Sequence, residues 1–158
     1  MITRLSADAR KIVLTSAADE ARRRGDRRLG TEHLLLGLLH VPDSPVTKAL
    51  GTDLESARTA SDALDRSALA AIGIDAAHLG EAPRDVHSRR LLPMTSGARA
   101  VLKTAVEETR QTGSRRIETR QFLFALLERE RPDPAAELLY ALGVDPSAVR
   151  ARLESLEE

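Results

Sequence analysis

The sequence contains no cysteine, which excludes both a disulfide framework and a zinc site built on thiolates. Aromatic residues are scarce at 2% of the chain, with two Phe, one Tyr and no Trp. Because 42% of the residues are nevertheless hydrophobic, the core must consist of Leu, Ala, Val and Ile. Ala, Leu, Arg and Glu dominate the composition and are all good helix formers, so closely packed helices are expected.

Long apolar runs and an excess of one charge are also absent. No run approaches the ~20 apolar residues that a membrane-spanning helix needs. The 24 basic and 24 acidic residues cancel, which argues against a nucleic-acid or membrane-surface partner. The first residues, MITRLSADARK, lack the apolar centre of a signal peptide. We therefore expect a cytoplasmic protein with no nucleic-acid and no membrane partner.

Recurrent start and stop signals predict an all-α protein of eight helices. Hydroxyl or acidic residues that suit the N-cap position stand at Ser6, Thr31, Ser44, Asp53, Thr95, Thr119, Asp133 and Asp145. Prolines follow three of these caps, and glycines follow the ends of several predicted helices. Apolar residues recur at helical spacing between the signals, and no segment shows the sustained alternation typical of a strand.

The two halves of the chain align with an offset of 88 residues over their first two predicted helices. The matched pairs include Val13 with Val101, Leu14 with Leu102, Glu20 with Glu108, Gly25 with Gly113 and Thr31 with Thr119. This match indicates the duplication of a four-helix unit. We predict repeat one over about residues 5–72, a linker over about 73–94 and repeat two over about 95–155. Each unit is small, so we expect both to pack as one pseudo-symmetric domain.

The duplicated pattern resembles the Clp N-terminal repeat domain, found at the front of ClpA-, ClpB- and ClpC-type unfoldases. The segments that carry it are DEARRRGDRRLGTEHLLLGLLH, LPMTSGARAVLKTAVEETRQTG and IETRQFLFALLERE. The first half is closest to the ClpC type, whose members have Gly-Thr-Glu-His before an aliphatic run, as in residues 30–33 here. The resemblance extends from about Leu5 to Leu153 and implies two four-helix Clp repeats packed as one eight-helix domain.

Unfoldases of this family continue into ATPase modules, yet this sequence has no Gly-x-x-x-x-Gly-Lys-Ser/Thr loop to hold nucleotide phosphates. We therefore expect a stand-alone Clp-repeat protein that is not an enzyme and needs no cofactor. The composition is rich in Arg and Ala and poor in Lys, which favours an actinobacterial source.

The resemblance implies a non-enzymatic module of the Clp unfoldase–protease system that binds proteins or peptides. It would act as an adaptor, a substrate-recognition module or a decoy that sequesters ligands. The implied partners are a Clp unfoldase or peptidase, adaptors, arginine-phosphorylated proteins and cyclic peptide antibiotics. The alternative is a diverged scaffold or small-ligand sensor no longer linked to Clp proteolysis.

Glu32 and His33 have two interpretations. By their position alone they are helix-end residues, since an acid in the first turn favours the positive end of a helix by ~0.3–1 kcal/mol. The resemblance instead implies that Glu32 pairs with the guanidinium of phosphoarginine, a geometry that suits a carboxylate. Family members supply phosphate donors from the start of the first helix, where a one-residue shift would place Arg4 and Ser6. Arg120 replaces the acid in the second half, so we expect that pocket to have lost guanidinium binding.

Other sites receive less support from the sequence. Leu5, Leu91, Leu92 and Met94 flank the expected seam between the first helices and the linker. In ClpC-type domains this neighbourhood accepts hydrophobic segments and adaptors, but the same residues could simply close the core. His33 and His40 are two helical turns apart, too far for a chelating pair, and no metal site is predicted. No nucleophile, base and orienting group occur in a recognisable arrangement, so no catalytic residue is predicted.

Overall fold

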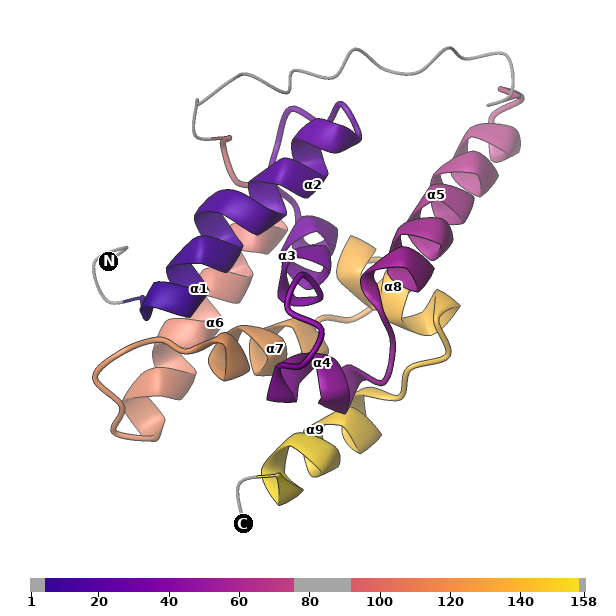
Figure 1. Ribbon diagram of the computed structural model, residues 1–158. Coiled ribbons are helices and arrows are strands. Elements are labelled where there is room, and N and C mark those ends of the chain that lie inside the picture. The colour runs from indigo at the N-terminus through magenta and orange to yellow at the C-terminus, as the bar shows by residue number, and fades with distance from the viewer. Residues whose placement is uncertain (1–4, 76–91, 157–158) are drawn as a thin grey trace.

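The computed structural model of the 158-residue chain describes residues 5–75 and 92–156. A continuous first helix comprises α1 (Ala7–Lys11), the π-helical η2 (Ile12–Ser16) and α2 (Ala17–Arg23). The others are α3 (Thr31–Leu38), α4 (Pro45–Leu50), α5 (Leu54–Ala71), α6 (Ser96–Gln111), α7 (Thr119–Leu127), α8 (Pro134–Ala141) and α9 (Pro146–Ser155). The described ranges thus form eight helices and no strand, which confirms the predicted all-α fold (Figure 1). Most of the predicted linker, residues 76–91, lies outside the described residues.

Most of the predicted helix caps are confirmed. The side chains of Ser6, Ser44, Asp53, Thr95, Asp133 and Asp145 each accept a hydrogen bond from a backbone N–H of the helix that follows. The caps predicted at Thr31 and Thr119 are wrong, because both residues are already the first residue of their helix. Gly30 and Glu118 are the N-cap residues instead, and the hydroxyl of Thr31 points across the molecule.

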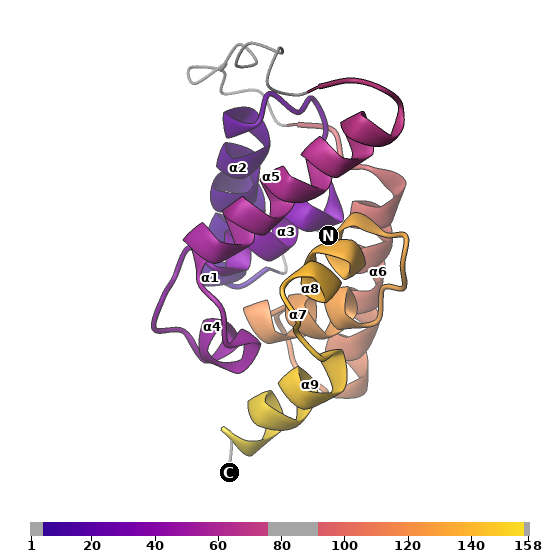
Figure 2. The same ribbon diagram turned by 90° about the vertical axis from the view of Figure 1, so that its right-hand side faces the viewer.

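Helices α3 and α7 form the centre of the molecule. Seven of the eight residues of α3 are buried, and so are seven of the nine residues of α7. Helix α2 packs against α3, α6 packs against α7, and α3 also contacts α7 and α8 (Figures 1 and 2). At the α2–α3 contact a Cβ on Gly37 would lie 3.0 Å from the backbone nitrogen of Ala17, so the close approach of the helices requires glycine.

The two repeats are joined by a reciprocal exchange of short segments. Leu29, before α3, forms a parallel bridge with Met94, before α6. Leu5, before α1, forms the equivalent bridge with Ile117, before α7. Hydrogen bonds from Thr95 N to Leu29 O at 2.9 Å and from Ser6 N to Ile117 O at 3.0 Å extend both bridges. The first helix of each repeat therefore begins beside the second helix of the other repeat.

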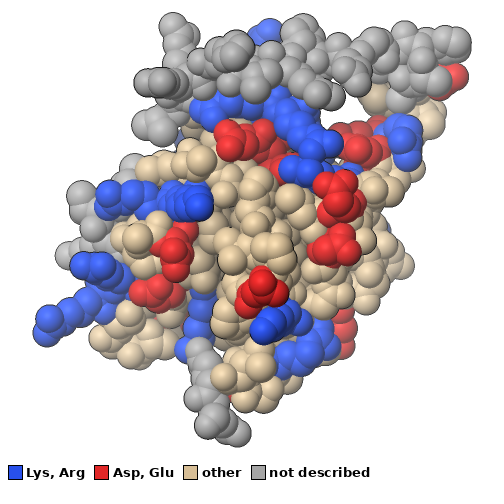
Figure 3. All heavy atoms as spheres, viewed as in Figure 1, with Lys and Arg blue, Asp and Glu red and all other residues tan. Residues whose placement is uncertain are grey.

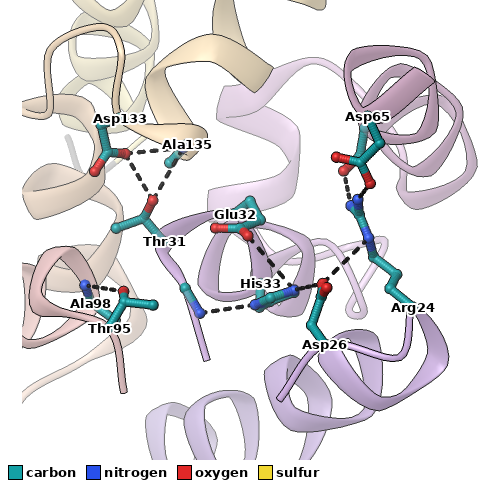
Figure 4. A network of polar contacts seen from close by, with 12 residues as sticks. Arg24, Asp26, Thr31, Glu32, His33, Asp65, Thr95, Ala98, Asp133 and Ala135 are labelled. Carbon is teal, nitrogen blue, oxygen red and sulfur yellow. Dashed lines mark hydrogen bonds and ion pairs between the residues drawn. The ribbon is translucent and has the colours of Figure 1, made fainter. Parts of the chain in front are cut away.

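Thr31 adds a side-chain link across the repeats. Its hydroxyl donates to Asp133 Oδ1 at 2.8 Å and accepts from the backbone N–H of Ala135 at 3.1 Å (Figure 4). Asp133 is also held by Arg129 Nε at 3.0 Å. Thr31 is only 2% exposed, so these bonds form within the core. They tie the start of α3 to the start of α8 and fix the position of the first turn of α3.

Candidate site at the start of helix α3

His33 lies inside the first turn of α3 and is bonded at both ring nitrogens. Its Nδ1 accepts a hydrogen bond from Gly30 N at 2.8 Å, and its Nε2 lies 2.8 Å from Asp26 Oδ2 (Figure 4). Because Nδ1 is an acceptor, we place the ring proton on Nε2, from which it is donated to Asp26. The residue is 1% exposed. This geometry confirms the interpretation of His33 as a structural residue of the helix end.

Gln121 occupies the same place in repeat two, 88 residues after His33. Its Oε1 accepts from Glu118 N at 2.8 Å, as His33 Nδ1 accepts from Gly30 N. We therefore expect His33→Gln to lower the free energy of unfolding by less than about 1 kcal/mol. His33→Leu leaves a buried N–H without an acceptor and should lower it by about 2 kcal/mol. Urea unfolding of both variants measures the difference, and equal losses would contradict this role.

Asp26 and Arg24 extend the network from α3 to α5. Asp26 Oδ2, which accepts from His33, also lies 3.6 Å from Arg24 Nε. The Arg24 guanidinium in turn donates hydrogen bonds to Ser61 and Asp65 on α5 (Figure 4). The loop between α2 and α3 is therefore held against two helices of its own repeat.

Glu32 makes fewer hydrogen bonds to the described residues than its neighbours Asp26 and His33. Its Oε1 lies 3.8 Å from His33 Nε2, whose proton is directed at Asp26. Its Oε2 is buried and has no hydrogen-bond partner among the described residues. The carboxylate lies over Gly30, where any Cβ would overlap it, and 23% of the side chain remains exposed. A carboxylate oxygen in this state favours a hydrogen-bond donor from outside the domain.

Among the residues that the structure describes, Asp26, Glu32 and His33 are the ones grouped closely enough to bind a metal. One ligand atom from each lies within 4.8 Å of the others. A metal on His33 Nε2 would require the ring proton to move to Nδ1, which faces the N–H of Gly30. The cluster therefore favours hydrogen bonding over metal coordination.

Ser6, one of the two residues predicted to bind beside Glu32, is engaged elsewhere. Ser6 uses its hydroxyl to cap α1, accepting from Ala9 N at 3.1 Å, and pairs with Ile117 ahead of α7. Among the residues that the structure describes, no hydrogen bond joins Ser6 to Glu32. Arg4 lies outside the described residues. The reciprocal exchange instead brings the first turn of α3 beside the first turn of α6, as Thr31 and Thr95 show in Figure 4.

The described residues that were predicted to flank an apolar groove belong to two separate parts of the molecule. Leu5 is 5% exposed, belongs to the core and pairs with Ile117. Met94 and Leu92 are partly buried against the core, and Met94 pairs with Leu29. Leu91 lies outside the described residues. Leu5 and Met94 therefore belong to two different bridges, and Leu5 closes the core.

A second polar cluster, not predicted from the sequence, surrounds Glu20. This carboxylate is 1% exposed and accepts hydrogen bonds from Arg58 Nε at 3.1 Å and His40 Nε2 at 2.8 Å. Burial raises the pKa of Glu20, but the hydrogen bonds and charges of Arg58 and His40 outweigh burial and lower the pKa overall. The signal in the sequence is that Glu20 lies on the same helix face as the buried Ala17 and Ala21.

Charges of both signs are interspersed over the face shown in Figure 3, without a large field of either sign. In the described part of the chain, no helix has both the length and the apolarity needed to cross a bilayer.

Comparison with known families settles the relationship that the duplicated helices suggest. The model of the Clp repeat (R) N-terminal domain matches residues 4–139. The chain belongs to this family. Chloroplastic ClpC2 chaperone of Oryza sativa subsp. japonica and chloroplastic ClpC1 chaperone of Arabidopsis thaliana are each 31% identical to it over 156 residues. Each alignment covers 97% of this chain and 15% of the relative, so this Clp repeat domain spans about 15% of those proteins' length.

A solved structure supports the fold independently. The N-terminal domain of the Clp protease-associated chaperone ClpD from Arabidopsis thaliana superposes with a TM-score of 0.72. The match covers 100% of both chains at 21% sequence identity. The eight-helix arrangement described above is therefore the fold of a Clp N-terminal domain.

Proposed function

We propose that this Clp repeat domain is a non-enzymatic module of the Clp unfoldase–protease system that binds segments of other proteins. The observation that carries the proposal is Glu32, whose buried Oε2 has no hydrogen-bond partner among the described residues. A guanidinium presents a planar pair of N–H donors that matches a carboxylate. Glu32 makes no side-chain hydrogen bond to the described residues, and its carboxylate occupies the space over Gly30 that a Cβ would fill.

The ligand class that fits best is an arginine or phosphoarginine side chain on an unfolded segment. Any phosphate donors must come from the element beside α3, which is the first turn of α6. Ser96 and Arg99 lie in that turn and are both exposed. We propose them in place of Ser6, whose hydroxyl caps α1, because Thr95 pairs with Leu29 directly ahead of the motif.

Titration of the ¹⁵N-labelled chain with phosphoarginine and with an arginine-containing unfolded peptide tests this function. We expect amide shifts in the first turns of α3 and α6, and affinities weaker by about tenfold or more in Glu32→Gln. Glu154→Gln, an exposed acid on α9, is the matched control and should bind as the wild type does. Arg99→Gln should weaken phosphoarginine binding and leave the affinity for unphosphorylated arginine nearly unchanged.

If neither titration shifts any amide resonance, the proposal is contradicted and a diverged scaffold or small-ligand sensor is favoured. The change of the acid to Arg120 in repeat two is the observation that supports this alternative. If segments do bind, adding the domain to a Clp degradation reaction separates a decoy from an adaptor or recognition module. An adaptor or recognition module accelerates degradation of the bound protein, whereas a decoy slows it.

A further inference from the structure

Two glutamates at equivalent positions of the two repeats have different surroundings. Glu20 in α2 is buried and bonded to Arg58 of α5 and to His40. Glu108 in α6 stands 88 residues later and is half-buried. Within residues 5–75 and 92–156, its carboxylate has neither a hydrogen bond nor an ion pair. Repeat two therefore presents a carboxylate whose counterpart in repeat one is neutralised.

The difference between the surroundings of Glu20 and Glu108 arises at the positions of repeat two that are equivalent to His40 and Arg58. The counterpart of His40 at the same offset is Glu128, a second acid. The counterpart of Arg58 is Arg150, since each lies five residues after the N-cap aspartate of its helix. Arg150 lies over the ring of Phe124 at 4.4 Å from the centroid, and its NH2 is 3.7 Å from Glu128 Oε1. Its guanidinium is therefore engaged at α7.

Glu108 and Glu128 line a groove of ≈ 980 Å³ along α6, called the α6 groove below. Leu102 and Val106 supply apolar surface in it and are only partly buried against the core. The remaining lining residues are Arg99, Ala100, Lys103, Thr104, Glu107, Arg110 and Gln111. Apolar side chains beside carboxylates form the kind of surface on which α5 is held in repeat one.

We propose that the α6 groove binds an amphipathic helix of a partner protein that places an arginine on Glu108. Helix α5 shows the required chemistry, because it carries Arg58 to Glu20 while Leu54, Ala57 and Leu64 on the same helix pack toward the core. A partner helix would need an arginine flanked by aliphatic residues at spacings of three and four. Its guanidinium would pair with Glu108, since Glu128 is already paired with Arg150, and its aliphatic residues would cover Leu102 and Val106. The groove meets the Glu32 site at Arg99, in the first turn of α6, but Glu108 lies near the opposite end of that helix.

A peptide of residues 53–72 is a direct probe, because it is the helix that already binds a glutamate of this kind. When the peptide is titrated into the ¹⁵N-labelled full chain, the amide resonances of residues 102–111 should shift, and the shifts should saturate as the peptide concentration rises. Its affinity should fall by about tenfold or more in the protein variant Glu108→Gln. The peptide variant Arg58→Ala should show the same loss on the wild-type protein. Glu154→Gln should bind the peptide as the wild type does.

Glu108→Gln should fold normally, because the carboxylate makes no described bond, and circular dichroism checks this. Equal binding by Glu108→Gln and wild type would overturn the proposal. So would an absence of shifts on α6, or shifts confined to α2, which would mean that the peptide only exchanges with α5 in repeat one.

Discussion

Replacing Phe122 with alanine is expected to lower the free energy of unfolding by about 4 kcal/mol. Phe122 is 2% exposed at the centre of α7, where the surrounding helices cannot collapse into the space that the ring leaves. Its counterpart in repeat one is Leu34, also 2% exposed. Phe122→Leu should therefore lower the free energy of unfolding by less than about 1.5 kcal/mol. Urea unfolding followed by circular dichroism measures both, and a loss below about 1 kcal/mol for Phe122→Ala would contradict the described core.

Glu20→Ala should lower the free energy of unfolding by about 3 kcal/mol. The substitution removes the acceptor shared by Arg58 and His40, whose side chains are 22% and 26% exposed and so regain little water where they lie. The matched control is Glu108→Gln in repeat two, where the carboxylate has no described partner. It should change the free energy of unfolding by no more than about 0.5 kcal/mol. Comparable losses in the two variants would contradict the difference between the repeats.

The Glu20 contribution also predicts a pH dependence. Its folded-state pKa is lowered below the ordinary value of 4.5, so the unfolded chain takes up the proton first as the pH falls. The stability that the carboxylate provides is therefore complete above about pH 4.5 and is lost as the pH falls through the lower folded-state pKa. The gap in unfolding free energy between wild type and Glu20→Gln should narrow as the pH falls below about 4.5. A gap that widened in acid would contradict the direction of the shift.

The helices were predictable because each carries its own local signals. Ser6, Ser44 and Asp53 cap the helices that they were expected to cap, since capping depends on residues within one turn. The caps predicted at Thr31 and Thr119 were wrong for a mainly local reason. The side chains of His33 and Gln121, within the first turn of each helix, accept from the N-cap N–H, and at Thr31 the hydroxyl is also engaged by Asp133, 102 residues away.

The candidate site was predictable only in part. The motif pointed to Glu32 as the candidate ligand-binding residue and to His33 as a structural residue of the helix end. Both could be predicted because each depends on residues within one helical turn. The neighbours of Glu32 depend on which first helix begins beside α3. Local sequence patterns do not encode the exchange of Leu29 with Met94 and of Leu5 with Ile117. For the same reason Glu20 and Glu108 are equivalent in the sequence, although residues distant in the chain pair with Glu20 and no described side chain pairs with Glu108.

The most direct test of the account is the affinity of the chain for an unfolded, arginine-phosphorylated protein carrying a fluorescent label. Fluorescence anisotropy would compare the wild type with Glu32→Gln and with the control Glu154→Gln. The account predicts saturable binding that weakens by about tenfold or more in Glu32→Gln and is unchanged in Glu154→Gln. Equal affinities for all three, or no binding by the wild type, would contradict the claim that Glu32 receives the guanidinium group of a protein segment.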